Sequence, residues 1–158
     1  MTNTHSETTR NAAVAAEWPE LSEGQRTWRV AVVEYVLADL GYYGLRIVDE
    51  RFGPALTEAL TAYRADRGLE DDTGRVDAAT WEQLTEDFGV VVQGHEGSRV
   101  RAVQYALNEG HGGGLAVDGI FGSATHSAVV SFQREAKLRI VDGEVGPETF
   151  PALITRGA

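Results

Sequence analysis

Acidic and histidine side chains are the residues of this 158-residue chain that could bind a metal or catalyse a reaction. An acidic run suggests calcium, but its glycine, Gly74, stands at the wrong position for an EF-hand loop and the twelfth-position glutamate is absent. The histidines suggest zinc, yet they form neither an HExxH motif nor a closely spaced pair. No G-x-S-x-G nucleophile elbow occurs. We therefore predict no catalytic residue, no metal site and no cofactor. The residues weighed are Glu70, Asp71, Asp72 and Asp77 for calcium, and His95, His111 and His126 with Asp118 for zinc.

Charge divides the chain into two parts. The net charge is −10, and the first 98 residues carry all of it, because residues 99–158 hold six basic and six acidic side chains. Affinity for nucleic acid depends on Lys and Arg neutralising phosphates, so the acidic part argues against a nucleic-acid partner. We expect any anionic target to meet the second part. The absence of cysteine excludes disulfides and thiol chemistry.

No targeting or membrane-spanning segment is recognisable in the sequence. Residues 1–16 are polar and lack the apolar run of a secretory signal. No stretch approaches the roughly 18 apolar residues of a membrane span. We therefore expect a chain that is cytoplasmic as synthesised and that acts outside the cell only through a non-classical export route or as part of a larger assembly.

One pattern occurs twice, about 70 residues apart. Residues 48–84 and 117–153 align without a gap at an offset of 69, and 11 of these 37 positions are identical. Such a repeat indicates a domain duplication. Each half is near the lower size limit for independent folding, so we expect the halves to pack on each other. The predicted units are a disordered tail at 1–16, a diverged repeat at 17–88, a linker at 89–97 and a second repeat at 98–158.

Helix signals occur three times in each repeat. Apolar residues recur at helical spacing, and capping or turn residues stand at the ends of each segment. The sequence therefore predicts an all-α protein, with two tandem three-helix bundles packed together and little or no sheet. The expected helices run from about 25 to 40, from 54 to 68, from 78 (behind an Asp77 cap) to 88, from a Ser98 cap to Gly110, from 123 onward and for a short stretch after Gly146-Pro147.

The first of these helices is apolar on two faces. A helix of this kind is usually buried between two layers. We therefore favour contact with the second repeat or with Trp18 over a surface for a separate partner. The two faces hold Val30, Val33 and Leu37 and, on the other side, Trp28, Val32, Tyr35 and Val36.

The ordered motifs of the second repeat resemble the type 1 peptidoglycan-binding domain. They run V-x-x-V-Q-x-x-L from Val100, V-D-G-x-F-G-x-x-T from Val117, A-V-x-x-F-Q from Ala128 and D-G-x-V-G-P-x-T-F from Asp142. With the diverged first copy, the resemblance spans about 125 of the 158 residues. It implies a three-helix bundle that serves wall-degrading or wall-associated machinery, holds peptidoglycan non-covalently and has no chemistry of its own.

Polar residues within these motifs are the candidates for contact with peptidoglycan. Glycine-rich turns expose backbone N–H groups, and arginines could pair with the carboxylates of stem peptides. A structural role is the more common one for any single residue of this kind, since side-chain bonds to turn backbone are frequent. The candidate ligand-binding residues are Asp118, Gly119, Thr125, Gln133, Arg134, Arg139, Asp142 and Gly143.

The first repeat departs from the family pattern at several of these positions. It has Glu50 in place of Gly119, Leu56 in place of Thr125 and Arg64 in place of Gln133, and it carries the acidic charge. We therefore expect the second repeat to recognise peptidoglycan, and the first to support it or to dock a protein partner.

Two classes of function follow from the resemblance. The first is a non-catalytic, cell-wall-associated protein that binds the glycan strand or stem peptide of peptidoglycan. The alternative is an adaptor or structural component of a phage-tail-like or secretion apparatus, or a partner of a wall enzyme. An open groove between residues 118–125 and 134–146 favours binding, whereas a groove filled by the first repeat or by Trp18 and Trp28 favours the adaptor. A hydrolase would need a partner chain to supply the chemistry.

Overall fold

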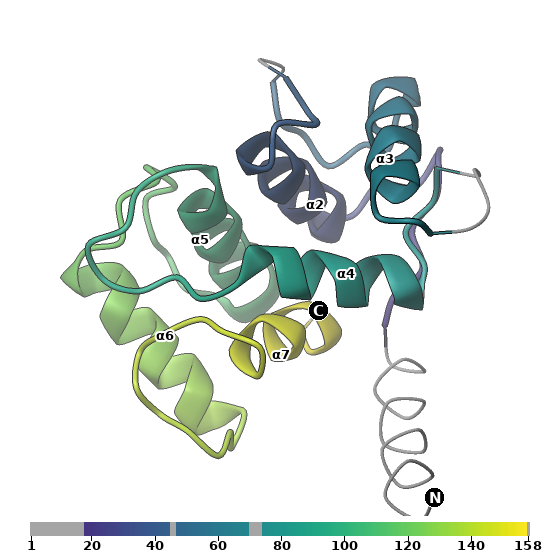
Figure 1. Ribbon diagram of the computed structural model, residues 1–158. Coiled ribbons are helices and arrows are strands. Elements are labelled where there is room, and N and C mark those ends of the chain that lie inside the picture. Colours follow the sequence, from purple (N-terminus) through teal and green to yellow (C-terminus); the bar gives the residue numbers. More distant parts are fainter. Residues whose placement is uncertain (1–17, 45–46, 70–73, 158) are drawn as a thin grey trace, which may run out of the picture.

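Six helices make up the described part of the chain, which comprises residues 18–44, 47–69 and 74–157 of a computed structural model (Figure 1). Extended pairing within these residues is limited to four isolated bridges, so the prediction of an all-α fold with little or no sheet is confirmed. None of these helices has the length and apolar character needed to cross a membrane. The helices are α2 (Trp28–Asp39), α3 (Pro54–Asp66), α4 (Ala78–Phe88), α5 (Ser98–His111), α6 (Ser123–Glu135) and α7 (Thr149–Thr155).

Each repeat contains three helices and a leading extended segment that pairs with two of its loops. In the first repeat this segment is 19–27, and in the second repeat it is 89–97. The segment predicted as a linker thus pairs with the second repeat in the way that 19–27 pairs with the first. The predicted tail at 1–16 lies outside the described residues. The bridges are Leu21 with Val76 and Arg26 with Arg51 in the first repeat, and Val91 with Val145 and Glu96 with Ile120 in the second.

Helix ends follow the predicted signals with small shifts. Asp77 caps α4 by accepting a hydrogen bond from the backbone N–H of Thr80 at 2.9 Å, as predicted. Ser98, by contrast, is the first residue of α5, and Gly97 takes the cap position without a side-chain bond. The predicted Ser98 cap was therefore wrong. The same helix continues past Gly110 because a glycine is tolerated inside it, and it ends at His111.

The two repeats pack on each other through their first helices, α2 and α5. Both apolar faces of α2 are largely buried, which confirms that this helix lies between two layers. Gly110 is required at the crossing, since a Cβ there would stand 2.7 Å from Cζ2 of Trp28. A glycine inside a helix costs about 1 kcal/mol relative to alanine, and here it lets the indole cover α5.

Aromatic and polar contacts join the repeats beyond these two helices. Phe88 of α4 stacks on Phe150 of α7 with ring centroids 4.4 Å apart, and the Tyr105 hydroxyl donates to Glu50 at 2.6 Å. Trp18 stacks on Trp81 with ring centroids 5.4 Å apart and so covers this residue of the first repeat. The buried apolar residues of both repeats form one continuous core, which compensates for the thin core of each half.

Candidate functional site

A buried glutamine holds the first Asp-Gly turn of the second repeat. Gln104, 1% exposed, accepts from the backbone N–H of Gly119 at 2.9 Å. Its amide donates to Asp118 Oδ1 at 3.0 Å, to the Ile120 carbonyl at 3.0 Å and to Thr125 Oγ1 at 3.1 Å. The backbone N–H of Ile120 and this amide hold the pKa of Asp118 below its usual value. The turn, its aspartate and the threonine therefore form one polar network.

The second Asp-Gly turn is held in the same way by Gln133. Its Oε1 accepts from the backbone N–H groups of Asp142 at 3.1 Å and Gly143 at 2.9 Å. Its Nε2 donates to Asp142 Oδ1 at 3.2 Å, to the Glu144 carbonyl at 2.9 Å and to Thr149 Oγ1 at 3.0 Å. Gly143 has φ +79° and lies under the His126 ring, where a Cβ would approach the ring to 2.2 Å, so only glycine fits.

The two networks share an eight-residue pattern that recurs at an offset of 24 residues. The segments DGIFGSAT from Asp118 and DGEVGPET from Asp142 share the pattern D-G-x-apolar-G-x-x-T, and each is preceded by its glutamine. Gln104 and Thr149 were absent from the predicted site, although this shared pattern was the signal that could have found them. Because both side chains are buried, the residues of this pattern serve to hold the two turns in place.

Six of the eight predicted site residues belong to these two turn networks. Thr125 and Gln133 are buried within these networks. Gln133 forms hydrogen bonds to the backbone of the turn, which is the structural role that the sequence analysis considered for such residues. The side chains of Arg134 and Arg139 are exposed and lie outside both networks. A role of any of the eight in ligand binding stays a prediction. The six network residues are Asp118, Gly119, Thr125, Gln133, Asp142 and Gly143.

A notch of about 150 Å³ opens beside the second network, and we name it the acidic notch. Exposed apolar side chains stand at it, with Ile140 60% and Val90 47% exposed. Val90 lies against Gly146, where a Cβ would be 3.4 Å from its Cγ2. The notch is lined by Val90, Ile140 and Pro147 on its apolar side and by the carboxylate residues Asp142, Glu144 and Glu148, together with Gly146 and Thr149.

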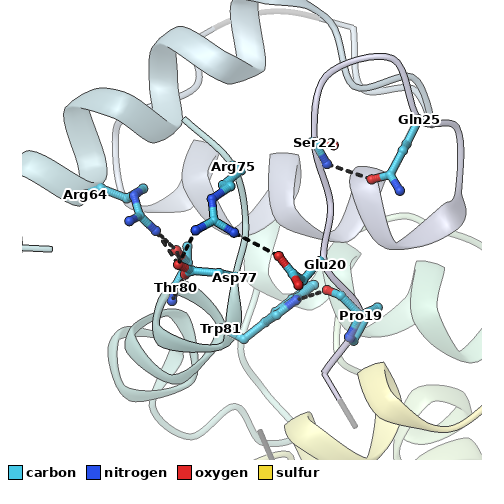
Figure 2. Close-up of polar contacts among 9 residues, drawn as sticks. All are labelled: Pro19, Glu20, Ser22, Gln25, Arg64, Arg75, Asp77, Thr80 and Trp81. Atoms are coloured by element: carbon cyan, nitrogen blue, oxygen red, sulfur yellow. Dashed lines mark hydrogen bonds and ion pairs between the residues drawn. The ribbon is translucent and has the colours of Figure 1, made fainter. Parts of the chain in front are cut away.

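At the corresponding place the first repeat has an ion pair between its own residues (Figure 2). Arg75 aligns with Glu144, and Glu20 aligns with Val90. Arg75 reaches Glu20 at 2.8 Å and also Asp77, which aligns with Gly146, at 3.7 Å. Arg75 thus binds both of the other two residues that differ from the second repeat.

The first repeat also supports its turns with different side chains. At the position of Gln133 it has Arg64, 2% exposed, which donates to Asp77 at 3.0 Å and to the Thr80 hydroxyl (Figure 2). At the position of Gln104 it has Glu34, which accepts from Tyr43 Oη at 3.1 Å and from the backbone N–H of Asp49 at 3.0 Å. Burial raises the pKa of Glu34 to about 7, and the hydrogen bonds from the Asp49 backbone and from Tyr43 offset part of this rise.

The residues weighed for metal binding have other surroundings. Within the described ranges, no three His, Asp or Glu side chains are arranged to hold a metal ion. His111 packs against Trp28 and Phe132 and hydrogen-bonds the Leu153 carbonyl at 3.0 Å, while Asp77 caps α4. The run Glu70, Asp71 and Asp72 lies outside the described residues.

A larger hollow of about 520 Å³ lies on the first repeat, between the turn at residues 42–44 and helix α3. Three alanines, Ala55, Ala59 and Ala62, face it together with Tyr42 and Glu58. One of its lining residues, Gly44, precedes in sequence residues 45 and 46, which are outside the described part of the chain. The acidic notch, whose lining residues are all described, is therefore the better-defined candidate site.

Comparison with known families gives two matches along this chain. The family described as "Putative peptidoglycan binding domain" matches residues 29–84 and residues 96–153. The chain belongs to this family. The peptidoglycan-binding resemblance of the sequence is thereby confirmed, in both copies, and each match takes in the three helices of one repeat.

Relatives of these peptidoglycan-binding repeats include two enzymes. The chain is 34% identical over 152 residues to N-acetylmuramoyl-L-alanine amidase CwlM of Mycobacterium tuberculosis (strain ATCC 25618 / H37Rv), covering 82% of this chain and 36% of the relative. It is 36% identical over 99 residues to the zinc D-Ala-D-Ala carboxypeptidase of Streptomyces albus G, covering 61% of this chain and 36% of the relative. The chain thus spans about a third of the length of these curated relatives.

A solved structure is also similar in sequence to part of the chain. It is the crystal structure of a peptidoglycan-binding protein from Clostridioides difficile in complex with glutamine hydroxamate. It is 38% identical to this chain, the match covers 44% of each chain, and the TM-score is 0.41.

Proposed function

We propose that this protein binds peptidoglycan at the bacterial cell wall, without catalysis of its own and mainly through its second repeat. Membership of the peptidoglycan-binding family supports the binding partner, and two similar enzymes carry names of peptidoglycan-cleaving activities. The family match accounts for both repeats as binding domains, which supports a binding function rather than a hydrolytic one.

The contrast between the open acidic notch and its closed counterpart carries the assignment to the second repeat. Of the groove predicted between residues 118–125 and 134–146, the notch includes residues of the second segment and none of the first. The two tryptophans do not line the notch, since Trp18 stacks on Trp81 and Trp28 covers Gly110 of α5. Arg134 and Arg139 are exposed on the same repeat, which has no net charge from residue 99 onward. An open recess with apolar and acidic walls, on a repeat that also exposes arginines, is suited to a zwitterionic peptide.

A single recognition site of this size predicts modest affinity. The notch holds about 150 Å³, well below the roughly 300–1,000 Å³ of typical small-molecule sites. A second copy raises avidity only if it binds as well, and the first repeat has its equivalent place occupied by Arg75 and Glu20. We therefore expect micromolar to millimolar binding that weakens with salt.

Co-sedimentation of the full-length chain with insoluble peptidoglycan sacculi tests the proposal. The variant Arg134→Glu/Arg139→Glu changes the second repeat, and Arg26→Glu/Arg51→Glu changes two exposed arginines of the first repeat by the same total charge. General repulsion from the wall is thus equal in the two variants. We expect saturable binding that drops about tenfold in the first variant and less than about twofold in the second.

Two outcomes would contradict the proposal in different ways. Equal losses in both variants would show charge-driven adsorption and no preference for the second repeat. Sedimentation no greater than that of an albumin control would exclude wall binding and favour the adaptor function, in which the same surface binds a protein.

A further inference from the structure

The acidic notch combines an apolar wall with an uncompensated group of carboxylates. Ile140, Val141 and Val90 are 60%, 41% and 47% exposed, which is unusual for aliphatic residues grouped on a small domain. None of the residues that line the notch is basic, and three of them are acidic. The second repeat is neutral from residue 99 onward, so this negative charge is local rather than a property of the whole repeat.

Hydrogen bonds within the protein occupy only part of these carboxylates. Asp142 uses one oxygen, Oδ1, to accept from Gln133 and from the backbone N–H of Glu144. Glu148 accepts from the backbone N–H of Ile140 through Oε1 at 3.4 Å. These three bonds orient the two carboxylates at the edge of the notch, and none of them neutralises the charge.

The first repeat places a cation at the corresponding surface, although it holds that cation with carboxylates at other positions than those of the notch. Arg75 stands at the position of Glu144 and places its guanidinium beside Glu20 and Asp77, the counterparts of Val90 and Gly146 (Figure 2). A cation on an aliphatic stem thus occupies this place in one copy of the fold. In the second repeat neither Val90 nor Glu144 can supply such a cation, and the place stays open.

We propose that the acidic notch binds an aliphatic chain that ends in a primary ammonium group. Its volume of about 150 Å³ equals about five water-sized volumes, enough for a short alkyl chain and one amine. The methylene groups would pack on Val90 and Ile140, and the ammonium would face Asp142, Glu144 and Glu148.

The occupant within peptidoglycan is the side-chain amine of the diamino acid in a stem peptide that is not cross-linked. This identification rests on the proposed function. Cross-linking converts the amine into an amide, which removes the charge and the match to the carboxylates. The exposed Arg139, adjacent to Ile140 in the chain, is placed to receive a carboxylate of the same peptide.

Titration of the full-length protein with a lysine-containing stem tripeptide, L-Ala-γ-D-Gln-L-Lys, tests the inference. The control ligand is the same peptide acetylated on the lysine side chain. Backbone amide chemical shifts in NMR spectra report binding and its location. We expect shifts at Val91, Gly146 and Thr149, and at least about tenfold weaker binding of the acetylated peptide.

Two variants and a matched control locate the charge that is responsible. Glu144→Gln should weaken binding of the amine by about fivefold, whereas Glu135→Gln, an exposed carboxylate of α6, should leave it unchanged. Val90→Glu/Glu144→Arg transfers the ion pair of the first repeat and should abolish binding of the tripeptide with no change in the unfolding midpoint.

The outcomes separate this inference from the proposed function. Equal affinity for the free and acetylated peptides, or no shifts at the notch, overturns the amine site even when the protein sediments with sacculi. A preference for the free amine supports the site even when sacculi are not bound, in which case the proposed function fails and the amine belongs to another partner.

Discussion

The two repeats have the same order of helices and bridges and support it with different side chains. Where the second repeat has Gln104 and Gln133, the first has Glu34 and Arg64. A glutamine amide donates and accepts at the same time, whereas an arginine only donates and an ionised glutamate only accepts. Each change comes with a new partner, Tyr43 for the glutamate and Asp77 for the arginine. The fold therefore tolerates substitution at these positions when donors and acceptors remain balanced.

The repeats also differ on their surfaces. Exchange of Val90 for Glu20 and of Glu144 for Arg75 converts an open notch into an exposed ion pair. The leading segment and its bridges are the same in both copies. A few exposed residues thus separate a candidate binding surface from a closed one without altering the fold.

Removal of the glutamine at the second turn should give the largest effect on stability. In Gln133→Ala, the buried backbone N–H of Gly143 and the hydroxyl of Thr149 lose their partner. Each unsatisfied buried group costs about 1–3 kcal/mol, so we expect the free energy of unfolding to fall by about 3–4 kcal/mol. Urea denaturation followed by circular dichroism measures this change.

The exposed Gln93→Ala serves as the control for that experiment and should change the unfolding free energy by less than about 0.5 kcal/mol. A Gln133→Ala protein as stable as the parent would show that the turn does not depend on this side chain. Its role would then be sought in ligand binding.

Replacement of Glu34 by the residue of the second repeat should stabilise the protein in a pH-dependent way. Because the folded pKa of about 7 lies above the ordinary value of 4.5, the folded state retains a proton that the unfolded state has lost. The contribution of Glu34 to stability therefore becomes less favourable as the pH rises from about 4.5 to about 7 and stays so above that. At about 1.4 kcal/mol per pKa unit, this shift sets an upper limit of about 3.5 kcal/mol, so Glu34→Gln should gain about 3 kcal/mol at pH 8 and little at pH 4.

Unfolding free energies of the parent and Glu34→Gln at several pH values isolate this contribution, since all other titrating groups are common to both proteins. Asp49 and Tyr43, which contact Glu34, are unchanged in the variant. A gain that is the same at pH 4 and pH 8 would exclude ionisation of Glu34 as its source.

Disruption of the ion pair that closes the first repeat should give the smallest effect. Glu20 is 71% exposed in its side chain, and exposed ion pairs contribute little because water and salt screen them. We expect Glu20→Gln to change the unfolding free energy by less than about 0.5 kcal/mol. A loss of more than about 1 kcal/mol in thermal or urea denaturation would mean that the pair maintains the first repeat and does not merely cover its surface.

Residues with a local signature could be predicted from the sequence. Asp77 was recognised as a helix cap because capping depends on bonds to the next turn of the same helix. The burial of α2 between two layers followed from its two apolar faces. Ser98 was misassigned because Gly97 also permits a helix start, and local sequence does not distinguish the two.

The candidate site was harder to predict because its parts come from separate segments. Thr125 and Gln133 stood out as polar residues in an apolar pattern, and the structure places both in turn networks. Gln104 was not among the predicted site residues, because the turn that it contacts lies 15 residues further along the chain. The acidic notch was not foreseen, since Val90 belongs to the segment predicted as a linker.

The sequence by itself determined the duplication, the helical class and the family, because periodic apolar residues and Asp-Gly turns are local features repeated at a fixed offset. Only the tertiary structure decided which polar side chains are used inside the protein and which surface remains open. That decision depends on contacts such as Val90 with Gly146 and Glu20 with Arg75, which join residues more than 50 positions apart. The periodic pattern of apolar residues does not predict such contacts, because they form only when the leading segment of each repeat pairs with its loops.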